Sequence, residues 1–253
     1  MSKSDLHVHS IYSERPSDWF LQRLGAQESY TDPETIYRKA KENGMTYVTI
    51  TDHNRIDGAL LLKKNHPEDT FVSMEATTYF PEDGCKIHIL LYDITEEQFL
   101  IIQELRKNIY DLRRYIIDEN IAYSLAHATY SVNNKLTLDH IEKLILLFDV
   151  FEVINGARSK RSNNLWHTVL TGLTPEIIND LKIKHNIDPA SDKPGSKVSR
   201  EAPTTTPIFS FQKPIPKLKQ ILLKSLLIIL KTNLQPRPEE ITILGAWLFL
   251  YIK

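Results

Sequence analysis

Residues 5–10 read Asp-Leu-His-Val-His-Ser. The apolar residues beside the histidines predict a short strand over residues 5–9, which ends in a polar loop. Side chains two positions apart lie on the same face of a strand, so His7 and His9 point in the same direction. This stretch is the first of several predicted strands that carry or precede a side chain able to bind a metal ion.

Strands and helices alternate along the rest of the chain. Asp32 is a suitable N-cap for a helix that begins at Pro33 and ends at Asn43-Gly44. Further strands are predicted over residues 47–51, 71–78, 86–92, 121–126 and 150–154, with Asp83-Gly84 as a turn, and further helices over residues 95–119, 137–147, 161–173 and 175–184. This order predicts an α/β fold with a mostly parallel sheet. The number of repeats favours a barrel, with its active site at the carboxyl ends of the strands.

Composition excludes several classes of protein. Cys85 is the only cysteine, so a disulfide framework is excluded and a reducing, cytoplasmic location is predicted. The net charge of −1 gives no sign of stable nucleic-acid binding, and the polar first ten residues do not form a signal peptide. The 253 residues are 42% hydrophobic, which suits a globular protein with a substantial core.

Histidines and acids gather at the predicted strands. Seven such side chains lie in the strands or directly after them: His7, His9, Glu14, His53, Glu75, His88 and His127. Imidazole and carboxylate together suit zinc, manganese or iron. A single histidine beside a strand is usually structural, but the joint placement of these residues predicts a metal site. The remaining histidines (His66, His140, His167 and His185) are interpreted as surface or packing residues.

Six stretches resemble one family. Residues 5–10 resemble the first motif, D-x-H-x-H-S, of the PHP (polymerase and histidinol phosphatase) superfamily. Later motifs follow in order, namely Thr51-Asp52-His53-Asn54 (T-D-H), Glu75 (the third-strand glutamate), Lys86-Ile87-His88-Ile89-Leu90 (H-x-L), Leu125-Ala126-His127-Ala128 (A-H-P) and Phe151-Glu152-Val153-Ile154-Asn155-Gly156 (V-E-V-x-N). Ala128 replaces the proline of the family. The resemblance covers roughly residues 4–165 and is strongest to PHP modules found beside glycosyltransferase domains.

The resemblance implies a distorted (β/α)7 barrel of PHP type that holds two or three divalent metal ions (Zn, Mn or Fe). Matched by position, the first ion would be held by His7, His9 and Glu75, and the second by Glu75, His88 and His127, while Glu14 and His53 would contribute to a third. Many relatives have aspartate where Glu14 stands.

The resemblance also implies an activity and its supporting residues. A metal-bridging hydroxide, held by the ligands of the first ion, would hydrolyse a phosphate ester. The substrate would be a small phosphorylated molecule, a nucleotide or an oligonucleotide end. Asp5 and Asp52 would lie outside the ligands and orient imidazoles. Arg15, Arg55 and Arg158 lie near motif loops and could hold a substrate phosphate, although such arginines are more often only solvated.

The family usually completes its site with a late G-S-D-x-H motif, whose aspartate and histidine bind metal. In this chain no histidine follows His185, and Asp192 has no histidine two positions later. The resemblance therefore implies a barrel that is incomplete at the C-terminus, in which two of the ions each lack one ligand.

The chain changes character after residue 196. We assign residues 1–196 to the PHP-like domain and residues 197–253 to an atypical basic and apolar tail. The tail has nine Lys or Arg and three acids, a net charge of +6, which leaves −7 for the first 196 residues. Its apolar run over residues 241–252 is too short for a membrane span, and Lys224, Lys231, Pro236 and Pro238 oppose one continuous span, so no membrane association is predicted.

We hypothesise that this tail is out-of-frame translation that begins near Lys197. If the codons of residues 197–207 are read from one base earlier, permitted synonymous codons give Gly-Leu-Thr-Gly-Gly-Ser-Asp-Asp-His-Ser, which contains the absent motif. The codons were chosen to fit, so this agreement shows compatibility alone. The coding DNA tests the hypothesis, and other bases at the third codon positions would end it.

Other functions stay open at this point. Related barrels hydrolyse amides, so the same metal site would suit an amidohydrolase-type activity. The absent late ligands favour a catalytically inactive or regulatory PHP module. Metal analysis together with assays on phosphate esters and amides distinguishes these alternatives. The sequence leaves the oligomeric state undetermined.

Overall fold

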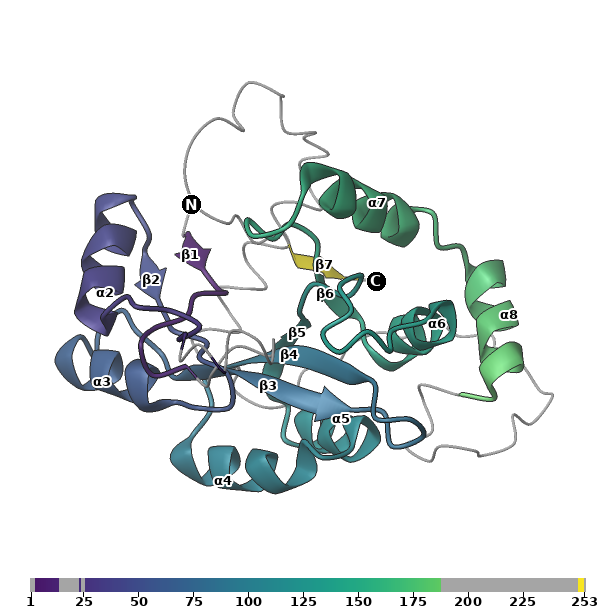
Figure 1. The fold of residues 1–253 in the computed structure, drawn as a ribbon, viewed down its shortest axis with the longest axis horizontal. Coiled ribbons are helices and arrows are strands. Elements are labelled where there is room, and N and C mark those ends of the chain that lie inside the picture. The colour runs from purple at the N-terminus through teal and green to yellow at the C-terminus, as the bar shows by residue number, and fades with distance from the viewer. Residues whose placement is uncertain (1–2, 14–22, 24–25, 188–249, 253) are drawn as a thin grey trace, which may run out of the picture.

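The computed structural model describes residues 3–13, 23, 26–187 and 250–252. It is a mixed α/β protein (Figure 1), and its elements carry the labels of that figure. The strands are β1 (Ser4–Asp5), β2 (Tyr47–Val48), β3 (Ser73–Tyr79), β4 (Lys86–Tyr92), β5 (Ala122–Leu125), β6 (Val150–Glu152) and β7 (Leu250–Ile252). The helices are α2 (Pro33–Glu42), α3 (Asp57–Asn65), α4 (Glu96–Leu105), α5 (Ile109–Asp118), α6 (Leu138–Leu147), α7 (Lys160–Thr171) and α8 (Pro175–His185).

The strands lie beside one another in the order of the chain. β1 and β2 form a parallel pair, and β3 to β7 form a second sheet in sequence order. Two isolated parallel bridges, Val48 with Thr70 and His53 with Glu75, connect the β2 region to β3 and its preceding segment. Among the described residues, no strand pairing joins β1 to β6 or β7. The closed (β/α)7 barrel therefore stays a prediction.

The prediction of a mostly parallel sheet is wrong. The pairs β3–β4, β4–β5 and β6–β7 are antiparallel, whereas β1–β2 and β5–β6 are parallel. The main cause is the turn that links β3 and β4, where Gly84 has φ of +73° and its N–H bonds to the carbonyl of Phe80 at 2.8 Å. A connection this short reverses the chain, whereas a parallel pair needs a longer crossover. β7 also adds an antiparallel neighbour from within the tail, while the domain division at residue 196 stays a prediction.

Local capping explains most helix boundaries. Asp32 caps α2 by accepting the Glu34 N–H at 2.9 Å, and Thr137 caps α6, as the sequence predicted. The expected helix over residues 95–119 is two helices, because Asn108 has extended backbone angles and caps α5. Helix α3 was not predicted, since its N-cap position is Ile56, which makes no side-chain cap.

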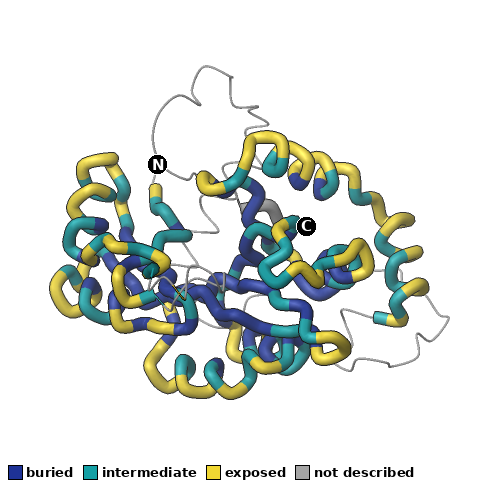
Figure 2. Tube along the Cα trace, in the orientation of Figure 1, coloured by how far each residue is buried: buried dark blue, intermediate teal, exposed yellow. Residues whose placement is uncertain are grey.

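All but one residue in each of β3 and β4 is buried, so both faces of this hairpin are covered (Figure 2). On one face Met74, Ile89 and Leu91 join the main hydrophobic core with Ile102 and Leu112 of α4 and α5. Complete burial of one such aliphatic side chain contributes about 1.5–3 kcal/mol. On the other face a smaller apolar cluster consists of Leu6, Phe71, Leu90, Tyr92 and Ala126. We call this the inner face, because it also carries the histidines and acids described below.

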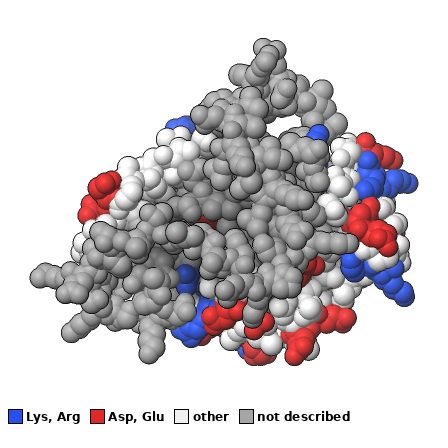
Figure 3. Space-filling model, turned by 180° about the vertical axis from the view of Figure 1, so that it is seen from behind, with Lys and Arg blue, Asp and Glu red and all other residues white. Residues whose placement is uncertain are grey.

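Basic and acidic side chains are interspersed where described residues reach the surface in Figure 3. Among the described residues, no helix has the length and apolar character needed to cross a lipid bilayer.

Candidate metal centre

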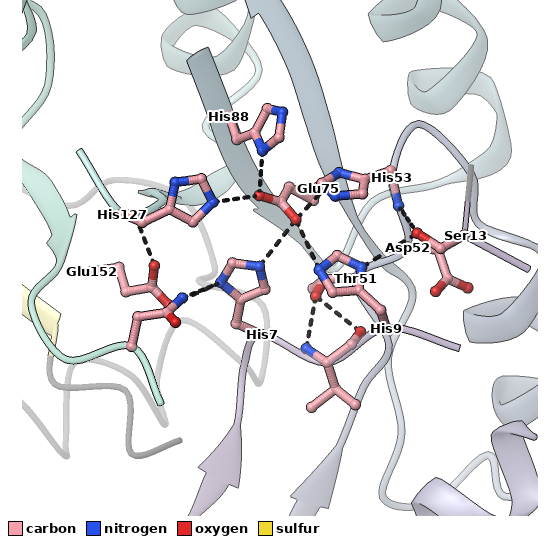
Figure 4. Close-up of polar contacts among 12 residues, drawn as sticks. His7, His9, Ser13, Thr51, Asp52, His53, Glu75, His88, His127 and Glu152 are labelled. Carbon is pink, nitrogen blue, oxygen red and sulfur yellow. Dashed lines mark hydrogen bonds and ion pairs between the residues drawn. The ribbon is translucent and has the colours of Figure 1, made fainter. Parts of the chain in front are cut away.

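Glu75 lies at the centre of a group of imidazoles on the inner face (Figure 4). The β3–β4 register pairs Thr77 with His88 and Glu75 with Leu90, so Glu75 and His88 lie on the same face of the hairpin. Because side chains alternate along a strand, a shift of one residue in this register would turn His88 away from Glu75. The hydrophobic pattern of the two strands thus fixes the position of the carboxylate.

Five imidazoles contact the two oxygens of Glu75. His7 Nε2 and His9 Nε2 each lie 3.0 Å from Oε2, and His53 Nδ1 lies 3.4 Å from it. On the other oxygen, Oε1, His88 Nδ1 lies at 2.9 Å and His127 Nε2 at 3.2 Å. The structure therefore brings together all six of these predicted ligands.

More imidazole nitrogens surround one oxygen of Glu75 than can form hydrogen bonds with it. Three imidazole nitrogens, from His7, His9 and His53, surround Glu75 Oε2 within 3.4 Å, although a carboxylate oxygen has lone-pair sites for about two donors. Donor atoms bound to one metal ion at about 2.1 Å stand roughly 3.0–3.4 Å apart. The distance of each nitrogen from this oxygen therefore fits a side chain that shares an ion with Glu75.

A second sign is a buried nitrogen without a partner. His88 is 4% exposed, and its Nε2 has no hydrogen-bond partner within the part of the chain that the structure describes. Two sets of donor atoms lie close enough together to hold an ion, namely His7, His9 and Glu75, and His53, Glu75 and His88. The first set is the one expected from the sequence. In the second set His53 takes the place in which His127 was expected.

Burial and neighbouring charges shift the pKa values of Glu75 and of the histidines around it in different directions. Burial raises the pKa of Glu75, but the charge of His7 is the largest of the effects that outweigh burial and hold this pKa well below its usual range. Burial lowers the pKa of His7, whereas Glu75 and Glu152 raise it well above its usual value. Burial lowers the pKa of His53 to about 3 and also lowers that of His88. A proton on His7 therefore balances Glu75, while the neutral His53 and His88 keep a lone pair for an ion.

Among the described residues, neither Asp5 nor Asp52 hydrogen-bonds an imidazole ring, and both instead hold the segment that carries His7 and His9. Asp5 Oδ1 accepts the His7 backbone N–H at 3.3 Å, and burial raises the pKa of Asp5 to about 6. Asp52 accepts the N–H and the hydroxyl of Ser10, both at 2.6 Å. Since Ser10 directly follows His9, these two hydrogen bonds, which we call the Asp52–Ser10 clamp, fix the backbone next to His9.

Gly58 of α3 makes room for this clamp. A Cβ atom at Gly58 would lie 2.7 Å from both Asp52 Oδ2 and Ser10 Oγ, which are buried and bonded to each other. We expect Gly58→Ala to lower stability by about 1–3 kcal/mol through overpacking, although alanine favours a helix. Thermal denaturation of the metal-free protein measures this, and an unchanged or higher Tm would contradict it.

Three side chains of the centre received no role from the sequence. Ser13 Oγ accepts the His53 N–H at 2.9 Å and lies 3.4 Å from His9 Nδ1. Glu152 Oε1 lies 2.8 Å from His7 Nδ1, and Asn155 Nδ2 donates to the same oxygen at 3.0 Å. Glu152 and Asn155 stand in a motif quoted above, and the acidic side chain of Glu152 within a predicted strand was the signal that could have identified it.

Among the remaining predicted residues that the structure describes, none contacts Glu75. Glu14 and Arg15 lie outside the described residues. Arg55 pairs with the exposed Asp57 at 2.9 Å. Arg158 lies over the Tyr130 ring at 3.5 Å, and Tyr130 packs edge-on against His127. Arg158 is therefore the predicted phosphate-binding arginine that lies beside the centre.

The four histidines interpreted as surface or packing residues in the sequence analysis lie away from the Glu75 cluster. His66 pairs with Glu34 at 2.8 Å, and His140 completes the capping box of α6. His167 is exposed on α7. His185 pairs with Glu142 at 2.6 Å, and together with Asp139 they form a third set of candidate ligands. Lys184 already neutralises those acids at 2.6 and 3.1 Å, so we interpret this set as an ion-pair link between α6 and α8.

The fold and the site define a mixed α/β protein with a buried histidine–glutamate cluster of the kind that binds divalent metal ions. No protein-family model matches the chain. Over 66 residues it is 39% identical to uncharacterized protein MJ1587 of Methanocaldococcus jannaschii. This match covers 26% of the present chain and 37% of that protein, well under two thirds of its length.

Two solved structures are similar at low identity. One is an amidohydrolase from Chromobacterium violaceum with bound sulfate and no metal, at 14% identity and a TM-score of 0.45, covering 68% of this chain and 84% of that one. The other, from Bifidobacterium adolescentis, is provisionally named a metal-dependent phosphoesterase, at 12% identity and a TM-score of 0.43, covering 77% and 89%. Likenesses this distant carry no argument about activity. Membership of the PHP family and the link to glycosyltransferase domains stay predictions.

Proposed function

We propose that this chain is a metal-dependent hydrolase of PHP type that acts on phosphate esters. The single observation that carries the proposal is the Glu75 carboxylate, buried and contacted by five imidazole nitrogens at 2.9–3.4 Å. A metal cation would offset the cost of burying this carboxylate among imidazoles, and a mixed nitrogen and oxygen donor set suits zinc, manganese or iron. We propose two or three such ions, held by His7, His9, His53, Glu75, His88 and His127.

The ions and the side chains have different tasks in this proposal. Divalent ions would activate a water molecule at neutral pH and neutralise the oxygens of a phosphoryl group. Glu75 lies between the two donor sets and would be shared by them. Asp52, through Ser10, holds the backbone that presents His9.

Arg158 supports the choice of a phosphate ester as substrate. Its guanidinium lies on the Tyr130 ring, and its buried Nε has no hydrogen-bond partner among the described residues. Tyr130 in turn lies 5.7 Å from His127, measured between ring centroids. Arg158 is thus linked to His127 through one aromatic ring, and guanidinium groups suit phosphate oxygens. The substrate class would include small phosphate monoesters, nucleotides and oligonucleotide ends.

The test is a set of hydrolysis assays on the full chain. We expect hydrolysis of p-nitrophenyl phosphate or a dinucleotide after addition of Mn²⁺, Zn²⁺ or Fe²⁺, and loss of the activity with a chelator. Arg158→Ala should raise KM more than it lowers kcat, because it removes substrate binding and leaves the proposed ligands in place. Arg161→Ala is a matched control, since Arg161 is exposed on α7.

Other outcomes identify the alternatives. Hydrolysis of N-acyl amides without hydrolysis of phosphate esters would replace the proposed substrate with an amide. If the protein binds metal but hydrolyses neither phosphate esters nor amides, it would be a regulatory module and not an enzyme.

A further inference from the structure

Glu152 connects two segments that carry histidines of the metal centre. It ends β6, is 2% exposed and lies on the inner face (Figure 4). One oxygen, Oε1, lies 2.8 Å from His7 Nδ1, and the other, Oε2, accepts the backbone N–H of His127 at 2.7 Å. The same carboxylate therefore contacts a segment from the beginning of the chain and one from its middle.

The contact with His7 determines which ring nitrogen faces Glu75. An ionised carboxylate only accepts hydrogen bonds, so His7 Nδ1 carries a proton that it donates to Glu152. His7 Nε2 is then the nitrogen directed at Glu75 Oε2, 3.0 Å away. An imidazole that ligates through Nε2 needs this arrangement, because its other nitrogen must keep its proton.

The contact with His127 supports an unusual backbone conformation. His127 has a φ of +28°, a region that residues with side chains rarely adopt. Such a conformation costs on the order of 1–3 kcal/mol and persists where the surroundings hold it. β5 and β6 share a single paired position, Leu125 with Phe151, so the sheet itself holds this corner weakly. The bond from His127 N–H to Glu152 supplies a second attachment just beyond β5.

We propose that Glu152 is a positioning residue that couples the two sides of the metal centre. One carboxylate would fix the ring of His7, which contacts Glu75 Oε2, and the backbone of His127, whose ring contacts Glu75 Oε1. This inference rests on the proposed metal-dependent function, and it assigns Glu152 no direct contact with an ion.

The three donors to Glu152 make glutamine a poor replacement. His7 Nδ1, the His127 backbone N–H and Asn155 Nδ2 all face its two oxygens. A glutamine amide would present its own N–H₂ to one side. Placed toward His7, the amide would favour a proton on Nε2, which opposes metal binding. Placed toward His127, the amide N–H₂ would face the backbone N–H of His127, and two donors cannot form a hydrogen bond with each other.

The first test measures metal binding by wild type, Glu152→Gln, Glu152→Asp and a matched control, Glu97→Gln, at an exposed position of α4. We expect Glu152→Gln to lower the affinity for Zn²⁺ about 10- to 100-fold in competition titrations, as for other partners of metal-bound histidines. The visible spectrum of bound Co²⁺ should change in intensity, because the ligand geometry changes. Glu152→Asp keeps an acceptor and should recover part of the affinity.

Wild-type affinity and an unchanged Co²⁺ spectrum in Glu152→Gln would overturn the inference. A lower Tm of metal-free Glu152→Gln with normal metal binding would also overturn it, since Glu152 would then be structural only.

The second test separates this inference from the proposed function. If wild type binds no metal, the proposed function fails, but the metal-free protein still reports on Glu152. NMR spectra should show a slowly exchanging Nδ1–H proton of His7 in wild type and in Glu97→Gln. We expect Glu152→Gln to shift this signal or lose it. An identical signal in Glu152→Gln would overturn the role of Glu152 whatever the metal content.

Discussion

Glu75→Gln should abolish tight binding of divalent ions. The carboxylate belongs to both sets of candidate ligands, so its removal affects both at once. The glutamine amide is neutral and directs an N–H₂ group at imidazole lone pairs. Loss of a hydrogen-bond partner outside the ligands lowers metal affinity about 10- to 100-fold, so loss of the shared ligand should exceed about 100-fold.

Equilibrium dialysis followed by elemental analysis measures this effect. Glu97→Gln makes the same chemical change at an exposed position and should retain the wild-type metal content. Circular dichroism of metal-free Glu75→Gln verifies that the variant is folded. Equal metal retention in Glu75→Gln and Glu97→Gln would refute the site.

Added Zn²⁺ or Mn²⁺ should raise the Tm of the wild-type chain substantially. An ion that binds only the folded state stabilises it by about 2.7 kcal/mol at a concentration of 100 times Kd. For a domain of this size that free energy corresponds to a shift of roughly 5–10 °C. The shift should diminish as the pH falls, because the His7 proton, favoured by Glu75 and Glu152, competes with the ion.

Two histidine variants provide the comparison. His7→Ala removes a nitrogen that lies 3.0 Å from Glu75 and should eliminate most of the metal-dependent shift. His167→Ala removes an exposed imidazole on α7 and should leave the shift unchanged. A shift of equal size in both variants would mean that the stabilising ion binds elsewhere.

Sequence signals of short range predicted part of the local structure. The bounds of β4 match the predicted residues 86–92, and α2 begins at Pro33 as predicted, because caps and alternation act over a few residues. Helix α3 was missed because no side-chain cap marks its start and Gly58 follows in its first turn. The predicted strand direction was wrong because the prediction relied on the alternation of strands and helices. It did not take account of the short turn at Gly84, which makes β3 and β4 antiparallel.

The candidate metal ligands were predicted from the sequence, but the residues that hold them in place were not. His88 and Glu75 were selected as candidate ligands because residue type and strand position suffice for that selection. Ser13 and Glu152 were missed because a support acts through a specific contact between distant segments. Glu152 is 145 positions from His7, and no local pattern reveals that pairing.

The order of the strands has a consequence for biosynthesis. Since neighbours in the sheets are neighbours in the chain, the strands of each sheet leave the ribosome in the order in which they lie in it. His7, His9, His53, Glu75 and His88 all precede residue 93, and the β3–β4 hairpin that joins two of them closes early because its contacts are local. A nascent polypeptide could thus capture its first ion while its second half is still being translated. The ion would then act as a nucleus around which later segments dock.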